Sequence, residues 1–181
     1  MKSITLHDKT FVPFITNEEL ESAIDKVAAQ LNQRHSADPE PPVLLCVLNG
    51  AMMFTSELMK RLDFVCELMT IKVSSYAGTT SQGTIKVDLP LTGNVKGRNV
   101  IICEDIVDTG GTIVFLNDYL KGQGALNVET CSMLLKPEIY KQDVKLDYVA
   151  MEIPARFIVG FGLDYDQLGR ATKDIYVLEE K

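Results

Sequence analysis

The sequence predicts an α/β fold in which a central, mainly parallel, twisted sheet is flanked by helices. Apolar runs such as 43–48 (VLLCVL) and 99–103 (NVIIC) are nearly continuous instead of alternating, as expected of strands that are covered on both faces. Stretches with helical spacing of apolar residues alternate with these runs, which is the order expected of parallel strands joined by crossover helices. The 181 residues suffice for one domain with a substantial core.

The first predicted helix spans 17–34. Its apolar residues recur at helical spacing: Leu20, Ile24, Val27, Ala28 and Leu31. Thr16 and Glu19 have the spacing of a capping box, which places the helix start directly after Thr16. The three prolines of 36–42 predict a surface loop after the helix.

The remaining elements are predicted in chain order. Strands are expected at 43–48, 64–76, 85–91, 99–103, 128–135, 148–153 and 174–178, with a short strand at 157–160. Helices are expected at 51–62 and 112–121, the second ended by Gly122. The small, polar, glycine-bearing stretch 77–84 predicts a mobile loop.

Composition narrows the function classes. The formal charge of −7 disfavours a general nucleic-acid binder, because such proteins contact phosphates through clustered Lys and Arg. No apolar stretch approaches the ~20 residues that span a bilayer, and the N-terminus has no apolar signal region, so we expect a cytoplasmic protein. The two histidines, His7 and His35, lie in the polar N-terminal region, which disfavours histidine-based catalysis and a histidine-rich metal site. Four cysteines are expected to be buried and reduced, at spacings that match no zinc pattern: Cys46, Cys66, Cys103 and Cys131.

Polar residues follow three predicted strands, and ligands of such sheets bind at the carboxyl ends of the strands. These residues are Asn49-Gly50, Glu104-Asp105 with the loop beyond them, and Lys136. Carboxylates accept hydrogen bonds, so the acid pair suits two ribose hydroxyls or a hydrated Mg²⁺. Taken alone, the pair equally fits a solvated strand end.

The loop 108–112 joins a predicted strand to a predicted helix. Unpaired N–H groups at a helix start bind phosphate, and glycines let the main chain approach an anion closely. Taken alone, the loop equally fits an ordinary turn with a threonine cap, and the chain contains no GxxxxGK[ST] phosphate-binding sequence. Acids and loop together favour a site for a phosphorylated sugar.

The stretch 100–112, VIICEDIVDTGGT, resembles the phosphoribosyl diphosphate motif of type I phosphoribosyltransferases. Four more stretches resemble one branch of that family, the hypoxanthine (hypoxanthine-guanine) phosphoribosyltransferases, in the family's order: VLNGAMMF at 47–54, IKVSSYAGTTSQGTIKV at 71–87, SMLLK at 132–136 and EIPARFIVGFGLDY at 152–165. The resemblance covers roughly residues 10 to 180. It implies one type I phosphoribosyltransferase-like domain, with a core at about 38–150, a small hood from about 1–37 and 151–181, and a mobile lid loop.

The resemblance also implies roles around the sugar and the pyrophosphate. Glu104 and Asp105 would hold the ribose 2- and 3-hydroxyls, with a Mg²⁺ nearby. The 5-phosphate would lie in a cradle made by Asp108, Thr109, Gly110, Gly111 and Thr112. The pyrophosphate loop would consist of Leu48, Asn49, Gly50 and Ala51. Arg170 would contact the pyrophosphate, Asp164 would position a second Mg²⁺ there, and the lid would include Ser75 and Tyr76.

For the purine, the resemblance implies a second set of roles. Asp108 would lie near N7 as general base or acid, and Lys136 would donate to the 6-oxo oxygen. Phe157 would stack on the ring, and the Ile158 main chain would meet the Watson–Crick edge, in the same segment as Asp164. Each residue has an ordinary structural alternative: Lys136 a surface lysine, Phe157 a core residue, Asp164 a turn residue, and Tyr76 the end of a strand.

Three positions depart from the family's pattern. Asn49 and Gly111 stand where many relatives carry lysine, and Arg156 replaces a frequent lysine. The first two changes remove positive charge from the phosphate-binding loops, so the substrate affinities of relatives do not carry over to this chain.

The reaction implied is transfer of the phosphoribosyl group from 5-phosphoribosyl 1-diphosphate to N9 of hypoxanthine, with guanine as a second substrate and Mg²⁺ as cofactor. A homodimer or homotetramer without nucleic-acid or membrane partners is expected. Two alternatives remain: a nucleotide-sensing regulator that binds RNA or DNA on the same fold, and a xanthine-preferring enzyme.

Overall fold

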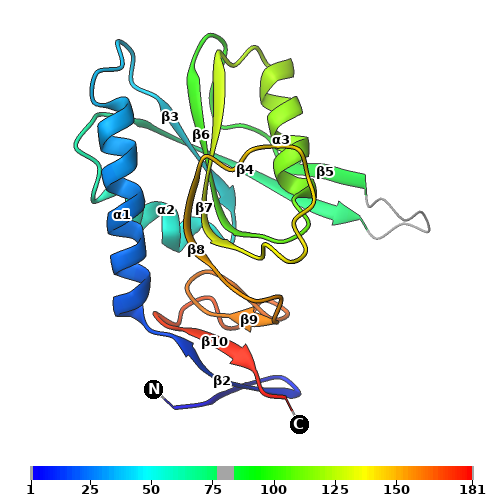
Figure 1. Ribbon diagram of the computed structural model, residues 1–181. Helices are drawn as coiled ribbons and strands as arrows, with labels where there is room; N and C mark the ends of the chain where they lie inside the picture. The colour runs from blue at the N-terminus through cyan, green and yellow to red at the C-terminus, as the bar shows by residue number, and fades with distance from the viewer. Residues whose placement is uncertain (1, 77–83, 181) are drawn as a thin grey trace.

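A six-stranded sheet forms the centre of the computed structural model, which describes residues 2–76 and 84–180 (Figure 1). Its strand order is β5-β4-β3-β6-β7-β8, and only the β4–β5 pair is antiparallel. The strands are β3 (Val43–Leu48), β4 (Glu67–Tyr76), β5 (Thr84–Leu89), β6 (Asn99–Val107), β7 (Asn127–Leu135) and β8 (Tyr148–Glu152). The predicted α/β class with a mainly parallel sheet is therefore confirmed.

Helices cover both faces of this sheet (Figure 1). Helices α1 (Asn17–His35) and α2 (Met52–Met59) pack on one face, and α3 (Gly111–Gly122) packs on the other. Alternate residues of β6 divide between the two cores, since Ile101 contributes to the cluster of α1 and α2, and Ile102 to that of α3. Burial on both faces explains why the strand sequences are nearly continuous apolar runs.

The start of α1 follows directly from the sequence. The Glu19 N–H donates to the Thr16 hydroxyl oxygen, and the Thr16 N–H donates to the Glu19 carboxylate at 2.8 Å, which completes the predicted capping box. The buried side of the helix contains the predicted apolar residues together with Ala23 and His35.

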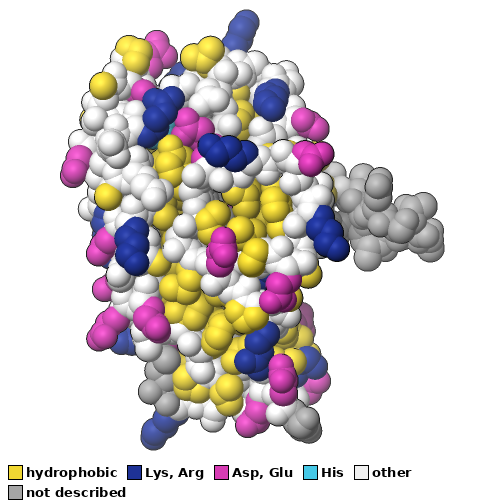
Figure 2. Space-filling view, in the orientation of Figure 1, with side chains coloured by type: hydrophobic (Ala, Val, Ile, Leu, Met, Phe, Trp, Pro, Cys, Tyr) yellow, Lys and Arg dark blue, Asp and Glu magenta, His cyan; other side chains and the backbone are white. Residues whose placement is uncertain are grey.

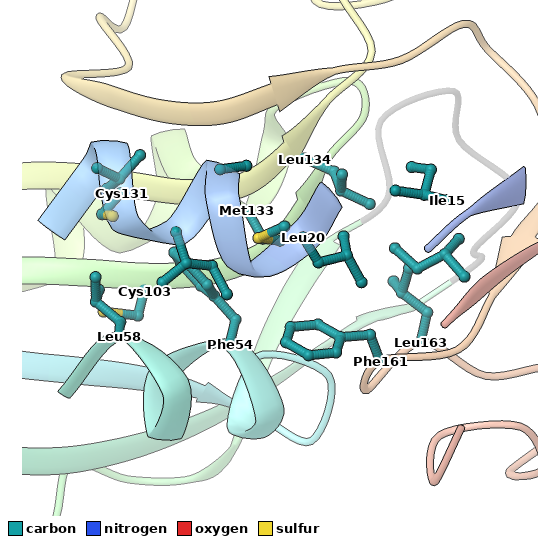
Figure 3. Close-up of a cluster of buried hydrophobic side chains, with 14 of the residues drawn as sticks. Ile15, Leu20, Phe54, Leu58, Cys103, Cys131, Met133, Leu134, Phe161 and Leu163 are labelled. Carbon is teal, nitrogen blue, oxygen red and sulfur yellow. The ribbon is translucent and has the colours of Figure 1, made fainter. Parts of the chain in front are cut away.

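A second, antiparallel sheet combines both ends of the chain in the order β1-β2-β10-β9. Its strands are β1 (Ile4–Leu6), β2 (Lys9–Ile15), β9 (Ile158–Val159) and β10 (Ile175–Leu178). The sequence analysis did not predict β1 and β2, because Pro13 interrupts the run and the partner strand β10 lies far along the chain. Figure 3 shows Ile15 and Leu163 beside Leu20 of α1, so this sheet shares a core with the central sheet.

Several element boundaries differ from the prediction. Strand β4 begins at Glu67, after the predicted 64, and α2 ends at Met59, before the predicted 62. Strand β6 continues to Val107, past the predicted 103, because its pairing with β7 persists after its pairing with β3 has ended. Most of the predicted loop 77–84 lies outside the described residues.

Three of the four cysteines are buried as predicted, whereas Cys66 is only partly buried, and all four are free thiols. Among residues 2–76 and 84–180, no helix is both long enough and apolar enough to cross a membrane.

Candidate functional site

The carboxyl ends of β3, β6 and β7 bring the predicted site residues to one edge of the central sheet. Lys136 directly follows β7, and its N–H donates to the Val107 carbonyl oxygen at the end of β6. Its Nζ lies 2.9 Å from Oδ1 of Asp108, although the two residues are far apart in sequence. Because Lys136 is only 8% exposed, it is not an ordinary surface lysine.

The loop 108–112 lines a cavity of about 850 Å³, together with Glu104. Helix α3 begins at Gly111, and its N-cap, Gly110, adopts a left-handed conformation with φ of 81°. No side chain caps this helix start, so a threonine cap, the alternative to phosphate binding, is absent from the described structure. The N–H groups of the first turn are thus left for an anion in the cavity.

The two acids, Glu104 and Asp105, lie within β6, and their side chains have different neighbours. Glu104 lines the cavity, whereas Asp105 faces Gly50, where an added Cβ would overlap the Asp105 carboxylate. Burial raises the pKa of Glu104 well above its usual range, and the charge of Asp105 raises it further. The Oε2 atom of Glu104 is buried and has no hydrogen-bond partner among the described residues. The alternative of a freely solvated acid pair is therefore wrong.

Asp105 is also held at an unusual pKa. Burial raises the pKa of its carboxyl from 3.8 to about 6, although the Ile106 N–H, which donates to Oδ1 at 2.8 Å, and the charge of Arg170 both oppose this. Buried carboxyls of this kind are stabilised in their charged form by a cation or by hydroxyl donors. Both acids therefore have the chemistry expected for ribose hydroxyls or Mg²⁺.

The loop 48–51 lies against the segment 160–170. A Cβ on Gly162 would overlap the carbonyl oxygen of Gly50, so the two main chains are in direct contact. Arg170 donates from Nη1 to the Gly162 carbonyl oxygen at 2.7 Å, and its Nη2 lies 2.6 Å from Oδ1 of Asp164. The Asp164 carboxylate also accepts from the Gln167 N–H, so it is a turn residue as well as the partner of Arg170. The sequence analysis missed Gly162, although the spacing of glycines in GFG marks a place where the main chain is closely approached.

Phe157 and Ile158 lie at the start of β9. Phe157 is 42% exposed, which excludes the core alternative, and its ring meets those of Tyr165 and Phe11 at centroid distances of 5.7 and 5.8 Å. The Phe157 carbonyl oxygen accepts from the Leu178 N–H, so it points toward β10. Because successive carbonyls of a strand point in opposite directions, the Ile158 carbonyl points to the open edge of the sheet.

Some predicted residues are not brought into the cavity over the phosphate loop. Phe157, Ile158 and Arg170 do not line it. Ser75 and Tyr76 end β4, where they pair with Ile85 and Thr84 of β5 next to residues outside the described chain. Among the described residues, a Cβ added at position 111 would meet the Ile85 Cδ1 atom alone, at 3.8 Å.

Comparison with known proteins agrees with this geometry. The family described as phosphoribosyl transferase domain matches residues 15–166. The chain is 38% identical to the hypoxanthine-guanine phosphoribosyltransferase of Streptococcus thermophilus, with 92% of each chain covered. It is 43% identical to that of Streptococcus agalactiae serotype V, over 77% of this chain and 78% of the relative.

Solved structures give the same result. The hypoxanthine phosphoribosyltransferase of Staphylococcus aureus superposes with a TM-score of 0.86 at 32% identity, over 92% of this chain and 90% of that one. The enzyme of Trypanosoma cruzi superposes with a TM-score of 0.87 at 31% identity, over 97% and 95%. On this evidence of sequence and structure, the chain belongs to the phosphoribosyl transferase family.

Proposed function

We propose that the protein transfers the phosphoribosyl group of 5-phosphoribosyl 1-diphosphate to N9 of hypoxanthine, and to guanine as a second substrate. The products are inosine or guanosine 5-monophosphate and pyrophosphate, so the reaction salvages purines. The pairing of Asp108 with buried Lys136 beside an uncapped helix start carries the proposal. In this arrangement a phosphate site would lie next to a site for a 6-oxopurine. The relatives named as hypoxanthine-guanine phosphoribosyltransferases support the same substrates.

The sugar phosphate would occupy the cavity over the loop 108–112. The 5-phosphate would accept from the N–H groups at the start of α3 and from the hydroxyls of Thr109 and Thr112. Glu104 contributes a buried oxygen without a partner, which would accept from a ribose hydroxyl. Binding in this orientation would hold C1 of the ribose for attack, so part of the rate enhancement is positional.

The purine would lie between Lys136 and Phe157. The Lys136 ammonium would donate to the 6-oxo oxygen, Phe157 would stack on the ring with its exposed face, and Ile158 would offer its main-chain carbonyl. The N9 lone pair would form the bond to C1 of the ribose while the bond from C1 to the pyrophosphate oxygen breaks. Asp108 would take the proton from N7 as that bond forms.

The leaving pyrophosphate would lie against the loop 48–51 and Arg170. The Arg170 guanidinium is held by Asp164 and by the Gly162 carbonyl, so its remaining N–H groups are fixed in direction. These donors would stabilise negative charge as it develops on the leaving group. Ser75 and Tyr76 would belong to a lid that excludes water from the reacting sugar.

The carboxylates of the site fit Mg²⁺, which prefers oxygen ligands. Glu104, whose buried Oε2 atom has no partner among the described residues, and Asp105 would hold one Mg²⁺ near the ribose, and Asp164 would position a second one at the pyrophosphate. Within residues 2–76 and 84–180, no three acidic, histidine or cysteine side chains cluster closely enough to hold a metal by themselves, so substrate oxygens would complete its shell. When bound, Mg²⁺ would neutralise charge on the pyrophosphate.

A nucleotide-sensing regulator that binds RNA or DNA is not favoured. On the face shown in Figure 2, the described Lys and Arg side chains are scattered among Asp and Glu and form no continuous basic stripe. The formal charge of −7 also disfavours binding to phosphate backbones.

A competition assay tests the proposed function. The purified protein is incubated with 5-phosphoribosyl 1-diphosphate, Mg²⁺ and equal amounts of hypoxanthine, guanine and xanthine, and the nucleotides are separated by chromatography. Inosine monophosphate should dominate, followed by guanosine monophosphate. A dominant xanthosine product would establish the xanthine-preferring alternative, and RNA retardation without any turnover would establish a regulator.

The four free thiols support a reducing, cytoplasmic setting. Sedimentation measurements would test the expected homodimer or homotetramer.

A further inference from the structure

The segment 137–147, which connects β7 to β8, lies against the phosphate loop. Gln142 donates from Nε2 to the carbonyl oxygen of Thr109 at 2.9 Å, and it lines the same cavity as the loop. Gln142 has no place in the motifs that predicted the site, and it lies 33 residues from Thr109 in sequence.

This hydrogen bond sets the direction of a neighbouring phosphate donor. The peptide group between Thr109 and Gly110 is planar, so its carbonyl oxygen and its N–H point in opposite directions. When Gln142 holds the carbonyl oxygen on one side, the Gly110 N–H is turned to the other. The orientation of one N–H group of the predicted cradle therefore depends on the Gln142 amide.

The same segment packs closely on Gly110. A Cβ at this residue would overlap the ring of Tyr140 and lie 2.7 Å from Cγ of Gln142. The Tyr140 hydroxyl in turn donates to the carbonyl oxygen of Val144, which ties this segment to itself. Thus both the left-handed Gly110 and the carbonyl before it contact segment 137–147 directly.

The loop 108–112 also contains no lysine or arginine, so it has no positively charged side chain of its own. N–H and hydroxyl donors depend strongly on direction, whereas a lysine acts as a mobile point charge. A phosphate held at this loop by uncharged donors therefore depends more on the aim of each donor.

We propose that Gln142 is a positioning residue for the phosphate loop, and that it acts through the Thr109 carbonyl to aim the Gly110 N–H at the 5-phosphate of the sugar substrate. The proposal rests on the proposed function. Gln142 itself takes no part in the proton transfer, and its effect is on the binding of 5-phosphoribosyl 1-diphosphate.

The test compares three variants by steady-state kinetics and thermal unfolding. Gln142→Ala removes the donor, Gln142→Glu keeps the shape but replaces the donor with an acceptor, and Ile139→Ala is a neutral control on the same segment. Loss of one directional hydrogen bond should raise KM for 5-phosphoribosyl 1-diphosphate about three- to tenfold in Gln142→Ala. Gln142→Glu should raise it at least as much, because it also adds negative charge. In both variants KM for hypoxanthine, kcat and Tm should stay close to wild type, and Ile139→Ala should match wild type throughout.

The outcomes separate this role from a general structural one and from the proposed function. Unchanged KM for the diphosphate sugar in both Gln142 variants overturns the positioning role alone. A fall in Tm with a parallel fall in kcat and a rise in both KM values also overturns it, since it shows that Gln142 only supports the fold. If the wild-type protein forms no nucleotide from any of the three purines, the proposed function fails, and the positioning role fails with it.

Discussion

Replacing Glu129 with glutamine should lower the stability of the protein and flatten its dependence on pH. His35, at the end of α1, is buried between two carboxylates: its Nδ1 lies 2.8 Å from Asp38, and its Nε2 lies 3.2 Å from Glu129. Glu129 also accepts from the Tyr148 hydroxyl at 2.8 Å, and Arg34 Nη2 lies 3.6 Å away. This network joins the end of α1 to β7, far from the carboxyl edge of the sheet.

The size of the effect follows from the pKa of Glu129. The hydrogen bond from His35 lowers the pKa of this carboxyl from 4.5 to about 2, against the opposing effect of burial. A difference of this size corresponds to roughly 3 kcal/mol of folding free energy. Because the folded pKa is depressed, this contribution is present above pH 4.5 and is lost as the pH falls toward 2.

His35 limits the stability on the alkaline side. Burial alone lowers the pKa of the His35 imidazole. Its hydrogen bonds to the Glu129 and Asp38 carboxylates outweigh burial and raise this pKa above 6.5. A raised folded pKa means that the contribution is complete below pH 6.5 and is lost as the pH rises through the folded value. The network should therefore be strongest between about pH 5 and 6.5.

Urea unfolding followed by circular dichroism at about pH 4, 6 and 8 measures these contributions to the free energy of unfolding. Glu129→Gln should lose roughly 3 kcal/mol at pH 6, because it leaves a buried histidine with one carboxylate fewer. The free energy of unfolding of this variant should also vary less with pH than that of wild type, on the acidic side as well as on the alkaline side. The exposed Glu40→Gln serves as the matched control and should stay within about 0.5 kcal/mol of wild type. If Glu129→Gln behaves like this control and keeps the wild-type pH dependence, the assigned network is wrong.

Four further predictions concern the site, each measured by steady-state kinetics. Asp108→Asn should lower kcat by ~10²-fold or more, the usual scale for loss of a general base, and an unchanged kcat would remove Asp108 from that role. Lys136→Ala should impair hypoxanthine and guanine alike, because both carry the 6-oxo group; full activity would rule out the contact. Phe157→Ala should raise KM for the purine by about tenfold, given the usual strength of base stacking, and a rise in KM for the sugar substrate instead would contradict the stacking. Among the described residues a Cβ at residue 111 meets no atom closer than 3.8 Å, so Gly111→Lys should be accommodated and should lower KM for 5-phosphoribosyl 1-diphosphate, less so at high salt; an unchanged KM would show that residue 111 does not face a phosphate.

Local patterns predicted the elements whose causes are local. The capping box at Thr16 fixed the start of α1, and the apolar runs located the parallel strands within a few residues. By contrast, β2 contains Pro13 and is stabilised by pairing with β10 at the other end of the chain, so its own sequence does not reveal it. The burial of His35 was missed for the same reason, since its partner Glu129 is 94 residues away.

The site divides in the same way. The residues after strand ends, such as Lys136, could be placed at one edge because the carboxyl ends of parallel strands meet there. Two other contacts could not be predicted from the sequence: that of Gly162 with Gly50, and the hydrogen bond of Gln142 to Thr109. Each of them joins loops whose conformation no local pattern determines. The residues proposed to bind phosphate and purine could thus be named from the sequence, whereas the residues proposed to orient them are found only in the folded chain.

The neighbouring acids show how an irregularity within a strand bears on a functional assignment. If β6 ended at 103, as predicted, Glu104 and Asp105 would be free to turn toward one ligand. Strand β6 continues to Val107, but its printed pairing with β7 skips Asp105, and Cys103 and Ile106 both pack with the cluster of α1 and α2, where strict alternation would separate them. In this irregular stretch Glu104 lines the cavity, whereas Asp105 contacts Gly50 of the loop 48–51. We therefore propose that Glu104 is the acid that meets the sugar directly, and that Asp105 holds the loop proposed to bind the pyrophosphate.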